Sequence, residues 1–286
     1  MHITLLAALY VMKRLFLLVS ITLICFGCIN NSNKSNESKI TAESNFPSDK
    51  LEFASFADTT IYHIANIDSM PCLNITFDIT YPLATGVAGN DQLLTKDFIA
   101  NCIGKEYANK ASIEEAVNAF TRSEIKKYKS EVCGSSPETK LVGESWMNHE
   151  YYAKNNILYN AHGILSYSCY EYTFTGGAHG MNTTSCYVYD VYENQEIGIN
   201  SIFKEESLPN VLSLIKEQLA LHEGAESIDM SYVNVTENFY ADEVGIHWIY
   251  NPYEIAPYAV GAIEVVLPYS KIENYFTDNT PIKSIL

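Results

Sequence analysis

The first 27 residues place the strongest constraint on how this chain can fold. They hold no acidic side chain and two basic ones, Lys13 and Arg14, and an apolar run of 12 residues follows from Leu15 to Phe26. Gly27 and Cys28 come directly after this run. A basic segment, a short apolar segment, a small residue and a cysteine in this order are typical of the signal peptide of an exported lipoprotein. A helix that spans a bilayer needs about 20 apolar residues, so the run is too short for one.

Cys28 is therefore the expected lipidation site, and residues 1–27 are expected to be removed. Cys25 lies where leucine is usual in such signals. Because Met12 could start a normal signal by itself, translation starts at either Met1 or Met12. A buried core helix is the alternative for the apolar run. The polar, aperiodic segment that follows (INNSNKSNESKITAESNFPSDK) argues against this alternative and is typical of a flexible tether. We expect a membrane-anchored lipoprotein of the bacterial cell envelope, in the periplasm or at the cell surface, attached through its N-terminal lipid only.

The chain is acidic, with a net charge of −16 from 34 acidic and 18 basic side chains. Loss of residues 1–27 removes two positive charges and no negative one, which leaves 259 residues with a net charge of −18. Such a length can bury a core as one large or two small domains. The acidity disfavours nucleic acid and anionic membrane surfaces as partners, because both require positive charge. It is compatible with a basic protein partner, and the plainer explanation is that it keeps the protein soluble.

Five cysteines remain after removal of the signal, namely Cys72, Cys102, Cys133, Cys169 and Cys186. An exported protein reaches a compartment in which disulfides persist. The spacings include no CxxC motif and no paired histidines, so the sequence predicts no metal site, and it predicts no cofactor. Two disulfides with one free thiol are the simplest arrangement, and fully reduced buried cysteines are the alternative.

Hydrophobic periodicity predicts three helices separated by runs of strands. The best-signalled helix begins with a capping box formed by Ser112 and Glu115. Its expected apolar stripe consists of Ile113, Ala116, Val117, Phe120 and Tyr128. The others are expected over Asn90–Cys102 and from about Leu208 to His222. This order predicts an α+β fold with a mainly antiparallel sheet, about three helices and two subdomains. Strands are expected at Ile61–Ala65, Asn74–Tyr81, within 151–192, and at Val233–Tyr240, Gly245–Tyr250 and Gly261–Leu267.

Residues 167–174 and 181–189 predict a β-hairpin joined by a glycine-rich turn. Pairing Cys169 with Cys186 would place both cysteines within disulfide reach and would collect the apolar side chains on one face, namely Tyr170, Tyr172, Phe174, Met181, Tyr187 and Tyr189. We therefore expect a disulfide between Cys169 and Cys186. Cys102 and Cys133 lie near the far ends of two expected helices, and we expect a second disulfide between them.

Two motifs in the C-terminal half carry a family resemblance. The first runs from Phe174 to Gly180 (FTGGAHG) and is followed by Gly198 and Phe203 in the segment IGINSIF. The second consists of ENFY, IYNPYEIAPY and LPYS, at residues 237–240, 249–258 and 267–270. Together they resemble the extracytoplasmic domain of the RsiV-type anti-sigma factors, a domain that also accompanies peptidoglycan deacetylases of the PdaC type.

The resemblance covers about Phe174 to Ile272, and the region from about Asn74 to Glu171 resembles the companion domain of unknown function that precedes it in those proteins. RsiV proteins bind lysozyme, so the resemblance implies a lysozyme-like or other basic protein as partner. The association with deacetylases implies instead a role on cell-wall glycan. The implied organisation is a signal peptide (1–27), a tether (28–55), an α+β companion domain (56–165) and an RsiV-like domain (166–286).

His179 is the most tempting candidate for catalysis, because it lies in a glycine-rich turn with Glu171 and Glu254 as available partners. A histidine in this place could act as a general base or a metal ligand. The plainer interpretation is that Gly176 and Gly177 provide backbone conformations that other residues cannot adopt, while His179 packs against the turn. We favour this structural interpretation.

The segment Asn251–Tyr258 is expected to be a stiff loop between strands. Its two prolines restrict the unfolded chain, and its two tyrosines offer rigid contact area of the kind that anchors interfaces. A binding loop and a buried structural crossover fit this segment equally well. The candidate binding residues are therefore Gly176, Gly177, His179, Tyr253, Glu254 and Tyr258.

No enzyme motif stands out from the rest of the sequence. There is no GxSxG elbow, kinase set or Rossmann fingerprint, and His149-Glu150 lacks the second histidine of HExxH. His222 and His247 are expected to be ordinary packing or surface residues. The sequence therefore favours a lipid-anchored binding protein for a lysozyme-like or other basic protein, with a peptidoglycan enzyme or accessory factor that contacts a cell-wall fragment as the alternative.

Overall fold

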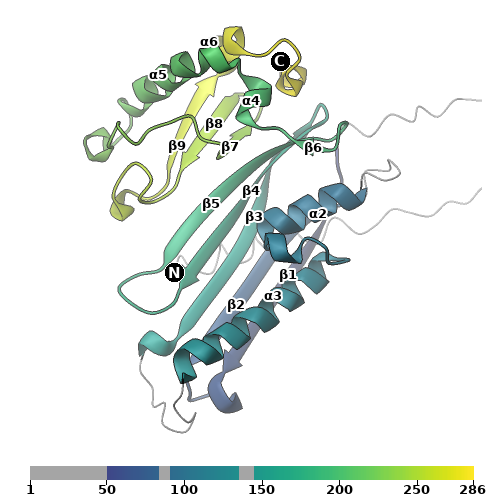
Figure 1. Ribbon diagram of the computed structural model, residues 1–286, viewed down its shortest axis with the longest axis vertical. Helices are drawn as coiled ribbons and strands as arrows, with labels where there is room; N and C mark the ends of the chain where they lie inside the picture. Colours follow the sequence, from purple (N-terminus) through teal and green to yellow (C-terminus); the bar gives the residue numbers. More distant parts are fainter. Residues whose placement is uncertain (1–49, 84–90, 135–144) are drawn as a thin grey trace, which may run out of the picture. The chain divides into compact units, whose positions relative to one another are not determined.

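The computed structural model of the protein describes residues 50–83, 91–134 and 145–286 (Figure 1). The expected signal peptide, Cys28 and most of the expected tether lie outside the described residues. No helix within the described ranges combines the length and the apolar character that a membrane crossing requires.

Six strands form a large sheet in the order β1-β2-β3-β4-β5-β6. Every neighbouring pair is antiparallel except β2 and β3, which are parallel. A parallel pair needs a long crossover, and helices α2 (Asp91–Cys102) and α3 (Ile113–Tyr128) lie in the chain between these two strands. The strands are β1 (Phe53–His63), β2 (Cys72–Pro82), β3 (His149–Ala161), β4 (Ile164–Phe174), β5 (Met181–Asp190) and β6 (Gln195–Glu196).

Helix α3 begins where the sequence predicts. Ser112 is its N-cap, and the Ser112 hydroxyl accepts a hydrogen bond from the backbone N–H of Glu115 at 3.1 Å. The Glu115 carboxylate in turn accepts one from the backbone N–H of Ala111 at 3.2 Å. The capping box is therefore confirmed. The expected apolar stripe is also confirmed, because its members are all buried: Ile113, Ala116, Val117, Phe120 and Tyr128.

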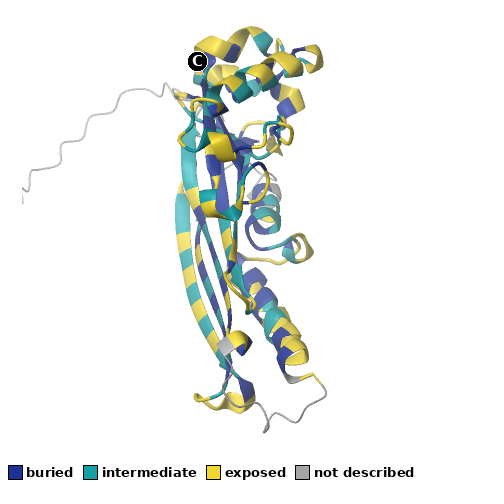
Figure 2. Cartoon of the chain, turned by 90° about the vertical axis from the view of Figure 1, so that its left-hand side faces the viewer, coloured by how far each residue is buried: buried dark blue, intermediate teal, exposed yellow. Residues whose placement is uncertain are grey.

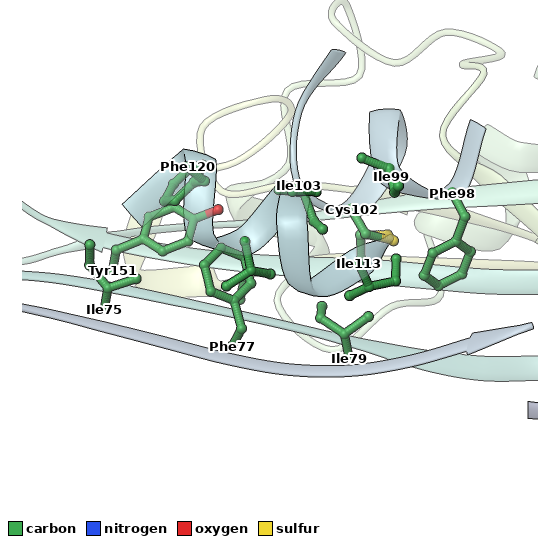
Figure 3. Close-up of a cluster of buried hydrophobic side chains, with 14 of the residues drawn as sticks. Ile75, Phe77, Ile79, Phe98, Ile99, Cys102, Ile103, Ile113, Phe120 and Tyr151 are labelled. Carbon is green, nitrogen blue, oxygen red and sulfur yellow. A yellow bond between two sulfur atoms is a disulfide. The ribbon is translucent and has the colours of Figure 1, made fainter. Parts of the chain in front are cut away.

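The first hydrophobic core lies between one face of the large sheet and helices α2 and α3 (Figure 3). Ile75, Phe77 and Ile79 alternate along β2 and are almost completely buried against Phe98 of α2 and Phe120 of α3. The rings of Phe77 and Phe120 meet edge to face, with their centroids 5.2 Å apart. Because side chains alternate along a strand, the residues between them point to the opposite face of the sheet.

The C-terminal part contains a second, three-stranded antiparallel sheet of β7 (Phe239–Ala241), β8 (Gly245–Tyr250) and β9 (Ile263–Pro268). Its core surrounds Trp248, which is fully buried beside the ring of Phe203. The periodicity of helix α5 (Leu208–Leu219) predicts a stripe of Val211, Leu212, Ile215 and Leu219. Val211, Ile215 and Leu219 are buried in this core, and Leu212 packs against it partly buried.

The α+β class and the mainly antiparallel pairing are confirmed. The described residues contain five α-helices in place of about three, because α4 (Ile199–Ile202) and α6 (Tyr269–Ile272) are single turns that show no periodicity. The strand expected over Val233–Tyr240 is wrong over most of its length, since β7 begins only at Phe239.

The hairpin of β4 and β5 forms, but its register differs by one residue from the expected register. Cys169 pairs with Ser185, and Ser168 pairs with Cys186. Since successive side chains point to opposite faces, this shift places Cys169 and Cys186 on opposite faces of the sheet. It also separates Tyr170 from Tyr187, which were expected on one face. The expected Cys169–Cys186 disulfide is therefore wrong.

The disulfide in the structure joins Cys102, at the end of α2, to Cys169 on β4, with the two Cα atoms 5.3 Å apart. This bond also excludes the expected pairing of Cys102 with Cys133. Packing of α2 across the sheet brings together cysteines that are 67 positions apart. The spacing of the cysteines along the sequence does not reveal this pairing. Among the described residues, Cys72 and Cys186 carry free thiols, and that of Cys186 is buried.

The two cores share strand β4. Leu165 and Tyr167 belong to the core under α2 and α3. Ile164, together with Val188 of β5, belongs to the core around Trp248. The domain boundary expected between residues 165 and 166 thus falls inside a strand whose two faces serve different cores.

Candidate functional site

Two asparagines of the second motif cover the free edge of β5. Strand β6 pairs only with the end of β5, so most of the outer edge of β5 has no partner strand. Asn251 and Asn238 fill this place: their amide oxygens accept hydrogen bonds from the backbone N–H groups of Thr184 and Cys186, each at 2.7 Å. Both amide groups also donate to the carbonyl oxygen of Thr184. These bonds satisfy the strand edge and hold the loops that carry the asparagines against the large sheet.

Glu237 connects the second motif to the IGINSIF segment. Its carboxylate accepts a hydrogen bond at 2.9 Å from the backbone N–H of Ile199, the first residue of α4. A carboxylate at this position satisfies an N–H group that a helix leaves free at its start. Gly198 lies so close that an added Cβ atom would be 3.3 Å from the Glu237 carboxylate. This hydrogen bond therefore joins the segment that follows the first motif to the second motif.

Glycines shape the turn between β4 and β5 because the chain passes close to neighbouring groups there. Gly176 has a φ of +88°, and a Cβ atom at this position would lie 2.5 Å from the carbonyl oxygen of Trp146. A Cβ atom at Gly180 would lie 2.4 Å from the ring of Tyr172. Gly177, with a φ of +105°, supplies a backbone conformation that other residues rarely adopt.

His179 stacks on Tyr258, with the ring centroids 4.1 Å apart. Its Nδ1 atom lies 2.8 Å from the carbonyl oxygen of Gly180, and the Tyr258 hydroxyl donates to the same oxygen at 2.9 Å. Tyr253, whose side chain is exposed, follows at 5.5 Å from the Tyr258 ring. The structure therefore brings together three of the candidate binding residues from two separate motifs.

The two candidate catalytic carboxylates bind elsewhere. Glu254 closes its own loop by accepting a hydrogen bond at 3.0 Å from the backbone N–H of Asn251. Glu171 accepts a hydrogen bond from the Tyr151 hydroxyl, on the sheet face that packs against α3. Neither is among the hydrogen-bond partners of His179 within the described residues. The described ranges also hold no group of three or more His, Cys, Asp or Glu side chains placed to share a metal ion.

A cluster of tyrosines that the sequence did not single out lies beside His179. Tyr152 of β3 stands directly across from Tyr172 of β4, and their neighbour Tyr170 lies 6.2 Å from the Tyr152 ring. Partial burial, followed by the nearby hydroxyls of Tyr172, Tyr258 and Tyr152, raises the pKa of Tyr170. The loop tyrosine Tyr258 is therefore close to the strand tyrosines. We call this surface the tyrosine face: Tyr152, Tyr170, Tyr172, His179, Tyr253 and Tyr258.

The strand tyrosines of the tyrosine face lie on the side of the large sheet opposite to α2 and α3. His179 and Tyr253 are exposed, and the other four members are partly exposed. Figure 2 colours each residue by burial and shows strands of the large sheet that carry intermediate and exposed residues. Along β4 the residues are buried as far as Cys169, and from Tyr170 to Phe174 they are intermediate or exposed. Lys154 is the cation of this part of the sheet, with its Nζ atom 5.5 Å from the Tyr170 ring centroid. The carboxylates of Asp78, Glu150 and Glu254 outnumber it, and all three are exposed.

The correct register would have revealed this surface from the sequence. With Tyr170 opposite Thr184 and Tyr172 opposite Asn182, the two tyrosines share a face with polar partners instead of apolar ones. Aromatic side chains on a polar sheet face indicate contact with a ligand more than a core.

Two family models match separate parts of this chain. Residues 200–270 match the family described as a protein of unknown function, DUF3298. Residues 70–182 match the family described as Deacetylase PdaC, over the region for which a companion domain was expected. No functionally curated protein matches the chain significantly.

Two solved structures are similar to this chain. A member of the DUF3298 family from Bacteroides fragilis is 25% identical, with a TM-score of 0.76 over 84% of this chain and 99% of that chain. A DUF3298 family protein from Pseudomonas aeruginosa, 17% identical with a TM-score of 0.57, covers 81% of this chain and 97% of its own, and it shows likeness of fold alone. Together the matches indicate a protein associated with the cell envelope and leave its role open.

Proposed function

We propose that this protein is an exported, lipid-anchored binding protein of the cell envelope that captures a basic, lysozyme-like protein through the tyrosine face. The observation that carries the proposal is the clustering of partly or fully exposed aromatic side chains from β3, β4 and two loops on one face of the large sheet. Tyrosines supply a large and rigid contact area at a low cost in conformational entropy, and they are enriched among the residues that dominate interface energies.

Charge supports a basic partner. The chain carries a net charge of −16, and the carboxylates of Asp78, Glu150 and Glu254 flank the tyrosine face with Lys154 as the opposing cation. A negative surface attracts a positive protein during encounter, so binding should be faster at low ionic strength. The resemblance to RsiV-type proteins, which bind lysozyme, suggests the class of partner.

Binding to lysozyme is the direct test. We expect the soluble part of the mature protein, residues 29–286 without the lipidated Cys28, to bind lysozyme at micromolar concentrations in calorimetry, more tightly at low than at physiological salt. Tyr258→Ala should weaken binding about tenfold or more, because it removes a central ring of the tyrosine face. Tyr232→Ala is the matched control, since Tyr232 is 66% exposed and lies outside this surface.

Tyr258→Phe separates the two contributions of this residue. It keeps the ring that stacks on His179 and loses only the hydrogen bond to the Gly180 carbonyl oxygen. Binding close to wild type is expected for this variant. Absence of binding by the wild type, or equal weakening by Tyr232→Ala and Tyr258→Ala, would contradict the proposal.

Export and lipidation are supported by the basic residues Lys13 and Arg14, the apolar run and Cys28. Cells that express the full chain and are fed a labelled fatty acid should incorporate the label into the protein. Cys28→Ala should abolish incorporation, whereas Cys25→Ala should leave it unchanged. Label that persists in the Cys28→Ala protein would remove the proposed anchor.

A cell-wall glycan is the second candidate ligand. The specific observation in its favour is that Tyr152, Tyr170 and Tyr172 project from a sheet face on which the pyranose rings of a glycan could stack. This observation supports an accessory binding role, because His179 shares no hydrogen bond with the candidate carboxylates. The same calorimetry with soluble peptidoglycan fragments in place of lysozyme distinguishes the two ligands.

A further inference from the structure

A chain of four polar side chains crosses the small sheet. His247 of β8 is buried, and its two ring nitrogens contact two carboxylates: Nδ1 lies 2.7 Å from Glu264 Oε1, and Nε2 lies 3.1 Å from Asp242 Oδ1. Tyr240 stacks on the His247 ring with a centroid distance of 4.3 Å and donates its hydroxyl proton to Glu264 Oε1 at 2.7 Å. From the sequence, His247 was expected to be an ordinary packing or surface residue.

This row of four polar side chains ends at a cavity of about 270 Å³. The cavity lies between β4 and β5 of the large sheet and β8 and β9 of the small one. Leu158, Ile249 and Ile263 form apolar walls of the cavity. Glu264 and Tyr240 form a polar side of it, and the Cys186 thiol also borders it. Burial, together with the neighbouring Glu264 carboxylate, raises the pKa of the Cys186 thiol to about 12, so this group stays neutral and adds no charge.

Glu264 is held in place and keeps one oxygen available. Its Oε1 atom already accepts two hydrogen bonds, from Tyr240 and His247, whereas Oε2 has no partner among the described residues. The side chain of Glu264 is half exposed, at 50%. Asp242 and Glu264 carry two negative charges, and His247 carries at most one positive charge. This group of residues therefore has a net negative charge. No Lys or Arg lines the cavity among the described residues.

We infer that this cavity is a lysine-binding site, in which the ammonium group of a partner's lysine side chain meets Glu264 while its aliphatic stem packs between Leu158, Ile249 and Ile263. The inference rests on the proposed function, for which it specifies how a basic protein is recognised. An ammonium group suits a single free carboxylate oxygen, whereas the guanidinium of arginine is best matched by two free oxygens of one carboxylate.

The position of the cavity beside the tyrosine face fits this role. Thr184 lines the cavity and stands directly across from Tyr170 in the hairpin register. A partner that covers the tyrosine face could therefore insert a lysine into the cavity at the same time. Removal of one partner of a desolvated charge pair weakens binding, because the other charge is left buried without a partner.

The test uses n-butylammonium chloride as a probe that mimics a lysine side chain, with n-butanol as its uncharged match. Methyl NMR signals of Leu158, Ile249 and Ile263 should shift in a saturable way with the ammonium probe, in the millimolar range, and much less with the alcohol. Glu264→Gln keeps an acceptor for Tyr240 and His247 but removes the charge, so it should weaken probe binding about tenfold or more.

A second variant tests the cavity without changing the polar side chains. Ala262 lines the cavity from an exposed position, so Ala262→Leu should narrow the cavity and weaken probe binding while Glu264 keeps its hydrogen bonds. Thermal unfolding of each variant shows whether it is folded. Lysozyme should bind Glu264→Gln about tenfold more weakly than the wild type.

The outcomes separate the two proposals. Saturable shifts in the wild type that Glu264→Gln abolishes support the lysine site, whether or not lysozyme binds. Shifts that are absent, or equal in the wild type and Glu264→Gln, overturn the lysine site even if lysozyme binds. Lysozyme that fails to bind a wild type with a working probe site would count against the proposed function alone.

Discussion

Replacing Cys102 and Cys169 by alanine together should lower the free energy of unfolding by about 4 kcal/mol. The disulfide closes a loop between cysteines 67 positions apart, and a loop of this length restricts the unfolded chain strongly. It also joins the end of α2 to the centre of the large sheet, where both cysteines are buried. Urea unfolding followed by far-UV circular dichroism measures the difference.

The matched control for this experiment is Cys72→Ser. Cys72 has a free, partly exposed thiol at the start of β2, so its replacement should change the free energy of unfolding by about 0.5 kcal/mol or less. Addition of a reducing agent should destabilise the wild type but not the double alanine variant. If the double variant unfolds at the same urea concentration as the wild type, the disulfide does not constrain the fold as described.

Asn238→Ala should lower the free energy of unfolding by about 3 kcal/mol. The Asn238 amide accepts from the backbone N–H of Cys186 and donates to the carbonyl oxygens of Thr184 and Ile249. Its removal leaves backbone groups of β5 and β8 without partners in a partly buried place, and such groups are costly. The free edge of β5 should then become accessible, so hydrogen exchange at Cys186 should accelerate.

Asn118→Ala provides the comparison for Asn238. Asn118 is exposed on α3, so its replacement should change the free energy of unfolding by about 0.5 kcal/mol or less. Asn238→Asp keeps the acceptor for Cys186 and loses only the donor groups, so it should fall between the wild type and Asn238→Ala. A loss of stability in Asn118→Ala equal to that in Asn238→Ala would refute the role assigned to Asn238.

The elements that were predicted well are those whose signals are local. The capping box of Ser112 and Glu115 depends on residues three positions apart, and both of its hydrogen bonds form. The stripe of α5 depends on helical periodicity. Three of its four expected members, Val211, Ile215 and Leu219, are buried, and Leu212 is partly buried. A single-turn helix such as α4 offers too few residues for periodicity to appear.

The candidate site was predicted only in part. His179, Tyr253 and Tyr258 were selected because their motifs were recognisable, and the structure brings their rings together. Tyr152, Tyr170 and Tyr172 were missed, because the expected register placed Tyr170 and Tyr172 on an apolar face. Glu264 and His247 were missed because their partners come from different strands.

By itself the sequence determined the α+β class, the helix that begins at Ser112, and the alternation of apolar residues along the strands. These properties follow from interactions between residues that are close in the chain. Tertiary structure alone decided the register of β4 and β5, and with it the partner of Cys169, the face of each tyrosine and the cavity at Glu264. Moving a strand by one residue exchanges its two faces while leaving its local pattern unchanged, so only the packing of helices and loops on each face selects between the two registers.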